Sequence, residues 1–219
     1  MDERLVFPAT ARNQDHIGNL LERFLASNVS VLEIASGSGE HGVNFQERFP
    51  DVTWQTSDPD PCHRKSISAW IDHQGLTLKM PQPLDLDVEK RPWLLSENFR
   101  STLKGIICIN MLHIAPWSCT TALFAESQNL LRKDDFLMLY GPFKRNGQHT
   151  SESNYLFHQS LKAQNSRWGI RNLEKVIEIG VENKKSVLVC ILDPNYIKKY
   201  YEIVSELRNN NIPTEIYLD

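Results

Sequence analysis

LEIASGSGEHG, the stretch from Leu32 to Gly42, carries three glycines and an acidic residue within a short distance. Gly37, Gly39 and Gly42 have the spacing G-x-G-x-x-G, which binds dinucleotides when it follows a strand and opens a helix. Glycine lets such a loop turn tightly and approach a ligand closely. Glu33 is an unexpected residue in the apolar run before the loop. Because the motif alone is weak evidence, the rest of the chain must indicate whether the ligand is NAD or another adenosine compound.

The glycine-rich stretch lies in a regular alternation of strands and helices. VSVLEIA (29–35) is apolar and β-branched, which predicts a strand, and GVNFQERF (42–49) predicts a helix that ends before Pro50. We expect further strands at 52–58, 78–88, 105–110, 135–143, 186–193 and 214–219, and further helices at 63–74, 120–132, 155–165, 172–180 and 196–210. This alternation predicts an α/β fold with a doubly wound, mostly parallel sheet.

The N-terminal residues look less regular. We expect residues 1–14 to be irregular, with Pro8 as a breaker, and a helix to begin at Asp15 and run through 17–27. The N-terminus has no basic region followed by an apolar one, so we expect no signal peptide. No apolar run approaches the ~20 residues that cross a membrane, so we expect no membrane partner.

The composition is that of an ordinary globular protein. The 219 residues are 41% hydrophobic and 23% charged, which suggests one α/β domain with a small appendage. The net charge of -3 gives no reason to expect a polyanion as the main partner. The four cysteines form no C-x-x-C pair, and this fits a reducing, cytoplasmic location.

Residues with suitable chemistry follow the expected strands, where doubly wound sheets bind their ligands. Asp58 follows the second strand, 19 positions beyond Gly39, and its carboxylate can accept hydrogen bonds from a ribose. Asp87 and Val88 follow the third strand, and we expect them near the amino group and the face of an adenine. A candidate reaction site follows the fourth strand, at Asn110, Met111 and His113.

Each of these residues also has a purely structural interpretation. The glycines can be required only by a tight turn between strand and helix. Asp58 can form an Asx-turn, and Asp87 can be a solvated acidic residue in a loop. Asn110 and His113 can be supporting hydrogen-bond partners instead of catalytic groups. The seven histidines do not form a recognised metal-binding spacing, so we expect no metal.

Several longer motifs occur in a characteristic order: VLEIASGSGEH, TWQTSDPDP, ICINMLHIAPW, LYGPFKRNGQHT and SRWGIRNLE. Together they resemble the methyltransferase-like 26 family, a branch of the class I S-adenosylmethionine-dependent methyltransferases. The resemblance covers residues 5–178. It implies a cofactor-binding domain at 1–180, S-adenosylmethionine as cofactor, and methyl transfer to an unidentified acceptor, more readily a small molecule than a macromolecule.

The resemblance also implies a set of site residues. The methionine and sugar part of the cofactor would be bound by Glu33, Ala35, Gly37 and Gly39, the ribose by Asp58, the adenine by Asp87 and Val88, and the methyl-transfer site would be lined by Asn110 and Met111. Ala35 stands where many members have a further glycine. Gly42 would then lie in the next helix, outside the loop, and its match to the dinucleotide motif would be a coincidence.

Two features depart from the family. Lys133-Asp134-Asp135 replaces the usual proline-glycine-glycine turn before the fifth strand, and we expect a local cost in stability. The segment 181–219 replaces the usual end of the sheet, and 187–219 resembles the start of the histidyl-tRNA synthetase anticodon-binding domain. We expect its two strands to pair at the open end of the sheet, because an uncovered edge promotes aggregation.

The preferred hypothesis is a methyltransferase that uses in-line displacement from the sulfonium, with Asn110 and His113 as catalytic candidates and His113 as the base. Lys144, Arg145 and His149 form a cationic loop that is either solvated or part of an acceptor-binding lid. Alternatives are a non-catalytic cofactor-binding scaffold and a tRNA-associated protein. NAD-dependent oxidoreduction is weaker, because no second nucleotide-binding half follows.

Overall fold

The computed structural model describes residues 2–182, 187–191 and 214–218, and it divides into two compact units at residues 107 and 108. Strand β3 (Leu103–Ile109) belongs to both units. The boundary that the sequence predicts at residue 180 stays a prediction.

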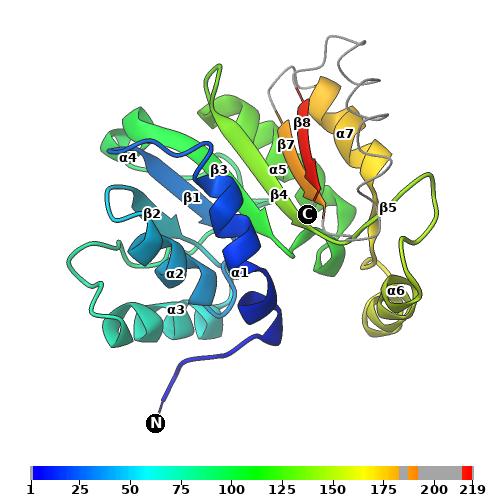
Figure 1. Ribbon diagram of the computed structural model, residues 1–219, viewed down its shortest axis with the longest axis horizontal. Helices are drawn as coiled ribbons and strands as arrows, with labels where there is room; N and C mark the ends of the chain where they lie inside the picture. The colour runs from blue at the N-terminus through cyan, green and yellow to red at the C-terminus, as the bar shows by residue number, and fades with distance from the viewer. Residues whose placement is uncertain (1, 183–186, 192–213, 219) are drawn as a thin grey trace. The chain divides into compact units, whose positions relative to one another are not determined.

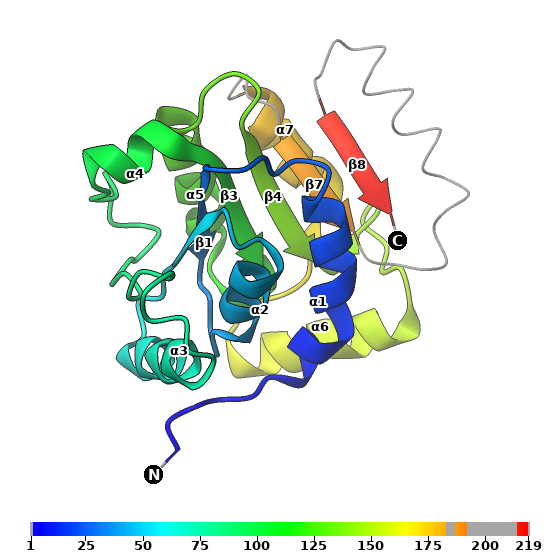
Figure 2. The same ribbon diagram turned by 60° about the vertical axis from the view of Figure 1, so that its left-hand side comes forward.

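The first unit is a parallel sheet with helices packed around it. Its strands are β2 (Thr53–Thr56), β1 (Ser30–Ile34) and β3, in that order, and Ser30 lies opposite Thr53. Its helices are α1 (Pro8–Leu21), α2 (Glu40–Arg48), α3 (Pro61–His73) and α4 (Glu97–Thr102). Helix α2 contacts α1, α3 and β2, and Figure 2 shows it in front of β1. Every residue of β1 is buried, as in strands covered on both faces.

Helix α1 begins earlier than its sequence predicts. Pro8 is its first residue and Phe7 its N-cap, so residues 8–14 are helical and not irregular. The expectation was wrong because proline at the first helical position lacks only an N–H that the helix does not use, and its φ suits a helix.

The strand that the sequence predicts at 78–88 does not form. Leu84 alone forms an isolated parallel bridge with Ser57, accepting from the N–H of Asp58 at 3.1 Å and donating to the carbonyl of Thr56 at 3.0 Å. Pro81 and Pro83 have no N–H to donate, so they interrupt any longer ladder.

The second unit extends from the end of β3 through a second set of strands. The order is β3, β4 (Phe136–Gly141), β7 (Val187–Ile191) and β8 (Thr214–Leu218), and β7 and β8 pair in parallel with the strand before them (Figure 1). β5 (Phe143–Lys144) and β6 (Arg171–Asn172) form a separate parallel pair. The remaining elements are the 3-10 helix η1 (Leu112–Ile114) and helices α5 (Trp117–Leu130), α6 (Glu152–Gln164) and α7 (Leu173–Glu182).

These pairings confirm the α/β fold with a mostly parallel sheet. The last two strands pair in parallel beyond β4. The helix that the sequence predicts at 196–210 lies outside the described residues. In the turn before β4, Asp134 has a φ of 71°, a left-handed conformation that glycine adopts more easily. No helix within the described ranges is long and apolar enough to cross a membrane.

Candidate functional site

The glycine-rich loop between β1 and α2 has an unusual backbone. Ala35, Gly37 and Gly39 have φ values of 54°, 58° and 93°, all in the left-handed region. A Cβ on Gly39 would lie 2.8 Å from the Cα of Ile67, so only glycine fits there. Ala35 adopts its conformation despite its side chain, which typically costs 1–2 kcal/mol. Such strained residues cluster at functional sites.

Asp58 holds this loop. Its Oδ2 accepts the N–H of Gly37 at 3.0 Å, and its Oδ1 accepts the N–H of Asp60 at 2.9 Å and lies 3.1 Å from Nδ1 of His63. The residue is 4% exposed. A carboxylate has about four acceptor positions, so Asp58 retains capacity for a further donor. The strand end therefore presents an anionic acceptor fixed against a glycine loop.

Glu33 is buried below the loop, with 1% exposure. Its Oε2 accepts a hydrogen bond from Nε1 of Trp54 at 2.7 Å. Burial raises the pKa of Glu33 to about 8, and the Trp54 hydrogen bond only partly opposes this while nearby Asp58 adds to it. The carboxyl is therefore largely protonated at neutral pH, and its expected role in cofactor binding stays a prediction.

Gly42 has a packing role that the sequence interpretation did not give it. A Cβ there would lie 2.5 Å from Cγ2 of Thr56 and 3.1 Å from Oε2 of Glu33. A close approach of helix to strand is what the third glycine of a dinucleotide motif provides. The structure confirms that Gly42 lies in α2, and the close packing of this helix on the sheet explains why the position has no side chain.

Asp87 and Val88 lie in a turn. Oδ1 of Asp87 accepts the N–H of Glu89 at 3.1 Å, and its Oδ2 lies 3.6 Å from Nζ of Lys90. Val88 is buried and its carbonyl accepts Nε1 of Trp93 at 3.2 Å. The proposed adenine contacts of Asp87 and Val88 stay predictions.

An N-terminal segment adjoins the glycine loop, and the sequence pattern did not reveal it. The N–H of Leu5 donates to Oγ of Ser66 at 2.8 Å, and its carbonyl accepts Nε1 of Trp70 at 2.9 Å. The N–H of Phe7 donates to Oε2 of Glu40 at 2.7 Å. These bonds fix the segment against α2 and α3.

The ring of Phe7 lies over the loop itself. A Cβ on Gly37 would be 3.0 Å from Cε2 of Phe7, and the Phe7 ring meets the ring of His63 edge-on, with centroids 5.9 Å apart. His63 in turn contacts Asp58. Phe7 and His63 are thus candidate site residues, and their only sequence signal is that His63 follows Asp58 closely.

A second group of candidate residues lies in the second unit, after β3. Asn110 has a φ of 60°, again left-handed directly after a strand, and its N–H donates to the carbonyl of Tyr140 at 2.8 Å. A Cβ on Gly141 would be 3.5 Å from both Oδ1 of Asn110 and Nδ1 of His113. Both side chains therefore lie beside Gly141. Met111 is buried and caps η1.

His113 is buried and unprotonated at neutral pH. Burial lowers the pKa of His113 to about 4, and the nearby guanidinium of Arg171 acts in the same direction. Its ring meets Phe157 edge-on at 5.4 Å, and its carbonyl accepts the N–H of Gly169 at 2.9 Å. A neutral imidazole can accept a proton, which a general base requires.

Arg171 holds the segment around His113 in place. Its Nε donates to the carbonyl of Leu112 at 2.9 Å, and its Nη2 donates to the carbonyls of Ala115 and Arg167. The guanidinium also lies 5.9 Å from the ring centroid of Trp117. Arg171 is a structural clamp that the sequence analysis did not single out.

The cationic loop after β4 is partly buried. Arg145 is 5% exposed, and its backbone pairs with Gln148 in both directions across a tight turn. The ring of His149 meets two rings of α6, with centroid distances of 5.6 Å to Tyr155 and 4.8 Å to His158. The loop is thus packed against α6 and is not a fully solvated segment.

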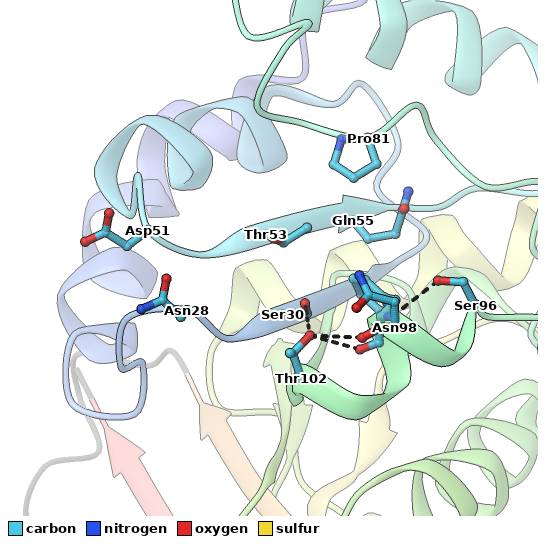
Figure 3. Close-up of a pocket in the computed structure, with 10 residues that line it drawn as sticks. Asn28, Ser30, Asp51, Thr53, Gln55, Pro81, Ser96, Asn98 and Thr102 are labelled. Carbon is cyan, nitrogen blue, oxygen red and sulfur yellow. Dashed lines mark hydrogen bonds between the residues drawn. The ribbon is translucent and has the colours of Figure 1, made fainter.

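A polar pocket of about 450 Å³ lies elsewhere in the first unit (Figure 3). It opens at the amino ends of β1 and β2, where Ser30 and Thr53 are the first residues. Oγ of Ser30 and Oγ1 of Thr102 are 2.7 Å apart, so part of its polar lining is bonded internally. The glycine loop is at the opposite, carboxyl end of β1. Within the described part of the chain, no group of three or more His, Cys, Asp or Glu side chains is arranged to hold a metal.

Comparisons with solved structures identify the class of fold. The chain resembles an O-methyltransferase family protein from Burkholderia thailandensis (TM-score 0.64, 12% identity, covering 80% of this chain and 52% of that one). It also resembles an O-methyltransferase family 2 protein from Planctomyces limnophilus in complex with apigenin (0.63, 15%, 80% and 53%). A third is human N-acetylserotonin methyltransferase in complex with SAM (0.63, 11%, 80% and 46%). At these identities the likeness shows the fold, and this chain spans about half the length of those proteins.

The chain belongs to the family described as "Protein of unknown function (DUF938)", whose model matches residues 4–193. A histidine–tRNA ligase from Pelagibacter ubique is 52% identical over 42 residues, which are 19% of this chain and 9% of that protein. This short match does not extend to the rest of either protein.

Proposed function

We propose that this protein is an S-adenosylmethionine-dependent methyltransferase that acts on a small-molecule acceptor. The observation that carries the proposal is the hydrogen bond between the Asp58 carboxylate and the N–H of Gly37, in a loop whose residues 35, 37 and 39 are all left-handed. The shared fold with methyltransferases, two of which are solved with SAM or a small molecule, supports it.

The residues of the first unit fit an adenosine-type cofactor. Gly37 has no side chain between its backbone and Phe7, and Asp58 keeps acceptor capacity for a ribose hydroxyl. In this proposal Ala35, Gly37 and Gly39 bind the methionine and sugar part. When bound, the cofactor supplies an electrophilic methyl group on its sulfonium.

The residues of the second unit would serve the acceptor. His113, neutral because it is buried, would accept the proton of an alcohol or amine acceptor. Asn110 would orient that acceptor with its amide, whose Oδ1 lies beside Gly141. Met111 would line the same site. Because methyl transfer depends mainly on alignment, orienting the acceptor and the cofactor would be the main contribution of the protein.

The test is calorimetric titration of S-adenosylmethionine and S-adenosylhomocysteine, with NAD as a negative control. We expect micromolar binding of both, and a loss of at least a hundredfold in Asp58→Asn, because the charged acceptor of the ribose is removed. The matched control is Asp15→Asn, which removes the same charge from an exposed position of α1. Absence of binding by the folded protein, or equal binding by Asp58→Asn, would overturn the proposal and favour a non-catalytic scaffold.

Two finer assignments belong to the same proposal. We infer membership of the methyltransferase-like 26 branch from the sequence motifs, and a cytoplasmic location from the cysteine pattern. A tRNA partner is a second candidate, favoured by the 42-residue match to a histidine–tRNA ligase. Tight tRNA binding that weakens steeply with salt would support it.

A further inference from the structure

We propose that Lys144, His149 and His158, here named the cationic subsite, bind an oxyanion of the methyl acceptor, either a carboxylate or a phosphate. The proposal rests on the methyltransferase function and adds the class of acceptor. All three residues belong to the second unit: Lys144 ends β5, His149 lies in the following loop, and His158 lies in α6 (Figure 1).

The subsite is held together by close packing. The rings of His149 and His158 are 4.8 Å apart and inclined by 60°. A Cβ on Gly169 would be 2.7 Å from Cε1 of His158 and 3.1 Å from Cε of Lys162. Glycine at this position therefore lets the segment before β6 pack closely against α6. The positions of both imidazoles are therefore set by the packing and not by solvent.

Hydrogen bonding leaves donors available in the subsite. The N–H of Ile170 donates to Nδ1 of His158 at 3.0 Å, so the proton of the neutral ring is on Nε2, which is a donor. Nδ1 of His149 is buried and has no hydrogen-bond partner among the described residues. Buried polar side-chain atoms usually have a partner, and one that lacks it can be completed by a water, an ion or a ligand. A ligand oxygen would complete this bonding.

The groups that act on the pKa values of Lys144 and His158 are basic side chains, and the Glu174 carboxylate accepts the N–H of Asn146 in the same loop at 2.9 Å. Within the described part of the chain, Lys144 and Lys162 form no ion pair with a carboxylate. Burial lowers the pKa of His158 to about 4, and Lys144, His149, Lys162 and Arg171 all act in the same direction. Burial also lowers the pKa of Lys144, with Lys162 adding to the effect. An anion is the ligand that relieves such repulsion.

The subsite adjoins the candidate base. Phe157, the residue before His158 in α6, meets the ring of His113 at 5.4 Å. Gly169 links the two places, because its N–H donates to the carbonyl of His113 at 2.9 Å and a Cβ on it would lie 2.7 Å from Cε1 of His158. The geometry points to an acceptor that carries its anionic group a short distance from the atom that is methylated.

The experiment uses the full chain and inorganic phosphate, with acetate as a second arm and chloride at equal ionic strength as the reference. Histidine ring signals followed by NMR at neutral pH report on the subsite directly. We expect phosphate or acetate, or both, to shift the His149 and His158 signals, and Lys144→Gln to weaken that binding about tenfold. The control Lys79→Gln removes the same charge from an exposed site and should bind as the parent does.

The outcomes separate the two anions and the two proposals. A response to phosphate alone indicates a phosphate-bearing acceptor, and a response to acetate indicates a carboxylate. If neither anion shifts these rings more than chloride does, or if Lys79→Gln weakens binding as much as Lys144→Gln, the subsite is refuted. His149→Gln serves as a second variant if Lys144→Gln fails to fold. Failure of S-adenosylmethionine binding with phosphate binding intact would refute the methyltransferase function alone.

Discussion

The glycine loop of the first unit and the cationic subsite of the second differ in how far partners compensate their charged groups. In the loop, the Asp58 carboxylate has three donors around it, from Gly37, Asp60 and His63. In the subsite, Lys144 has no ion-pair partner among the described residues, and the charged groups that act on it and on His158 are cationic. Hydrogen bonds within the protein thus compensate the carboxylate of the loop, whereas the Lys144 cation of the subsite has no ion-pair partner among the described residues.

From this difference we expect the loop to contribute to stability and the subsite to respond to a ligand. Compensated charges and packed glycines stabilise the loop, so substitution of its glycines should cost folding energy, whereas the buried Glu33 below it should lower stability once it ionises. Uncompensated cations are typical of sites that trade stability for function.

The largest effect is expected at Glu33, the buried acid below the loop. Its folded pKa of about 8 lies above its ordinary value of 4.5, so folding favours the protonated form. The stability of the parent should therefore fall as the pH rises from about 4.5 to about 8. Glu33→Gln removes this dependence and should gain on the order of 3 kcal/mol relative to the parent between pH 5 and pH 9.

Urea unfolding of both proteins at pH 5, 7 and 9 measures this difference. Glu89→Gln, at an exposed position, serves as the control and should show no such change with pH. A constant difference between Glu33→Gln and the parent at every pH would mean that Glu33 is ionised in the fold.

Gly39→Ala should destabilise the protein by about 3 kcal/mol. The new Cβ would lie 2.8 Å from the Cα of Ile67, and the φ of 93° is unfavourable for alanine. The matched control is Gly75→Ala, which has a φ of 66° but no neighbour within 4 Å and should cost about 1 kcal/mol. Thermal unfolding compares the two, and equal losses would show that the contact with Ile67 is easily relaxed.

Lys144→Gln should stabilise the protein slightly, by roughly 0.5 kcal/mol, because it removes a cation that faces Lys162. The gain should shrink at high salt, where the repulsion is screened. Lys90→Gln is the contrasting variant, because Lys90 lies 3.6 Å from the Asp87 carboxylate and should not become more stable without its charge. Melting temperatures at low and high salt measure both, and a loss of stability in Lys144→Gln would remove the contrast between the regions.

Local patterns predicted most of the fold and part of the site. The strand before the glycine loop, the helix after it and the position of Asp58 follow from hydrophobic spacing and glycine chemistry, which are local properties. The parallel sheet follows from the alternation of elements. Proline explains two differences between the prediction and the structure. Pro8 begins α1 instead of breaking the chain before it, and Pro81 and Pro83 have no N–H to donate to a strand at 78–88.

The order of the residues is enough to predict which backbone segments turn and which strand ends carry a carboxylate, amide or imidazole. The contacts of Phe7 with Gly37, of Trp54 with Glu33 and of His149 with His158 become visible in the fold alone. The physical reason is that burial, pKa and charge compensation depend on which side chains meet in space. Leu5 and Ser66 are 61 positions apart, yet they share a hydrogen bond that no spacing rule predicts.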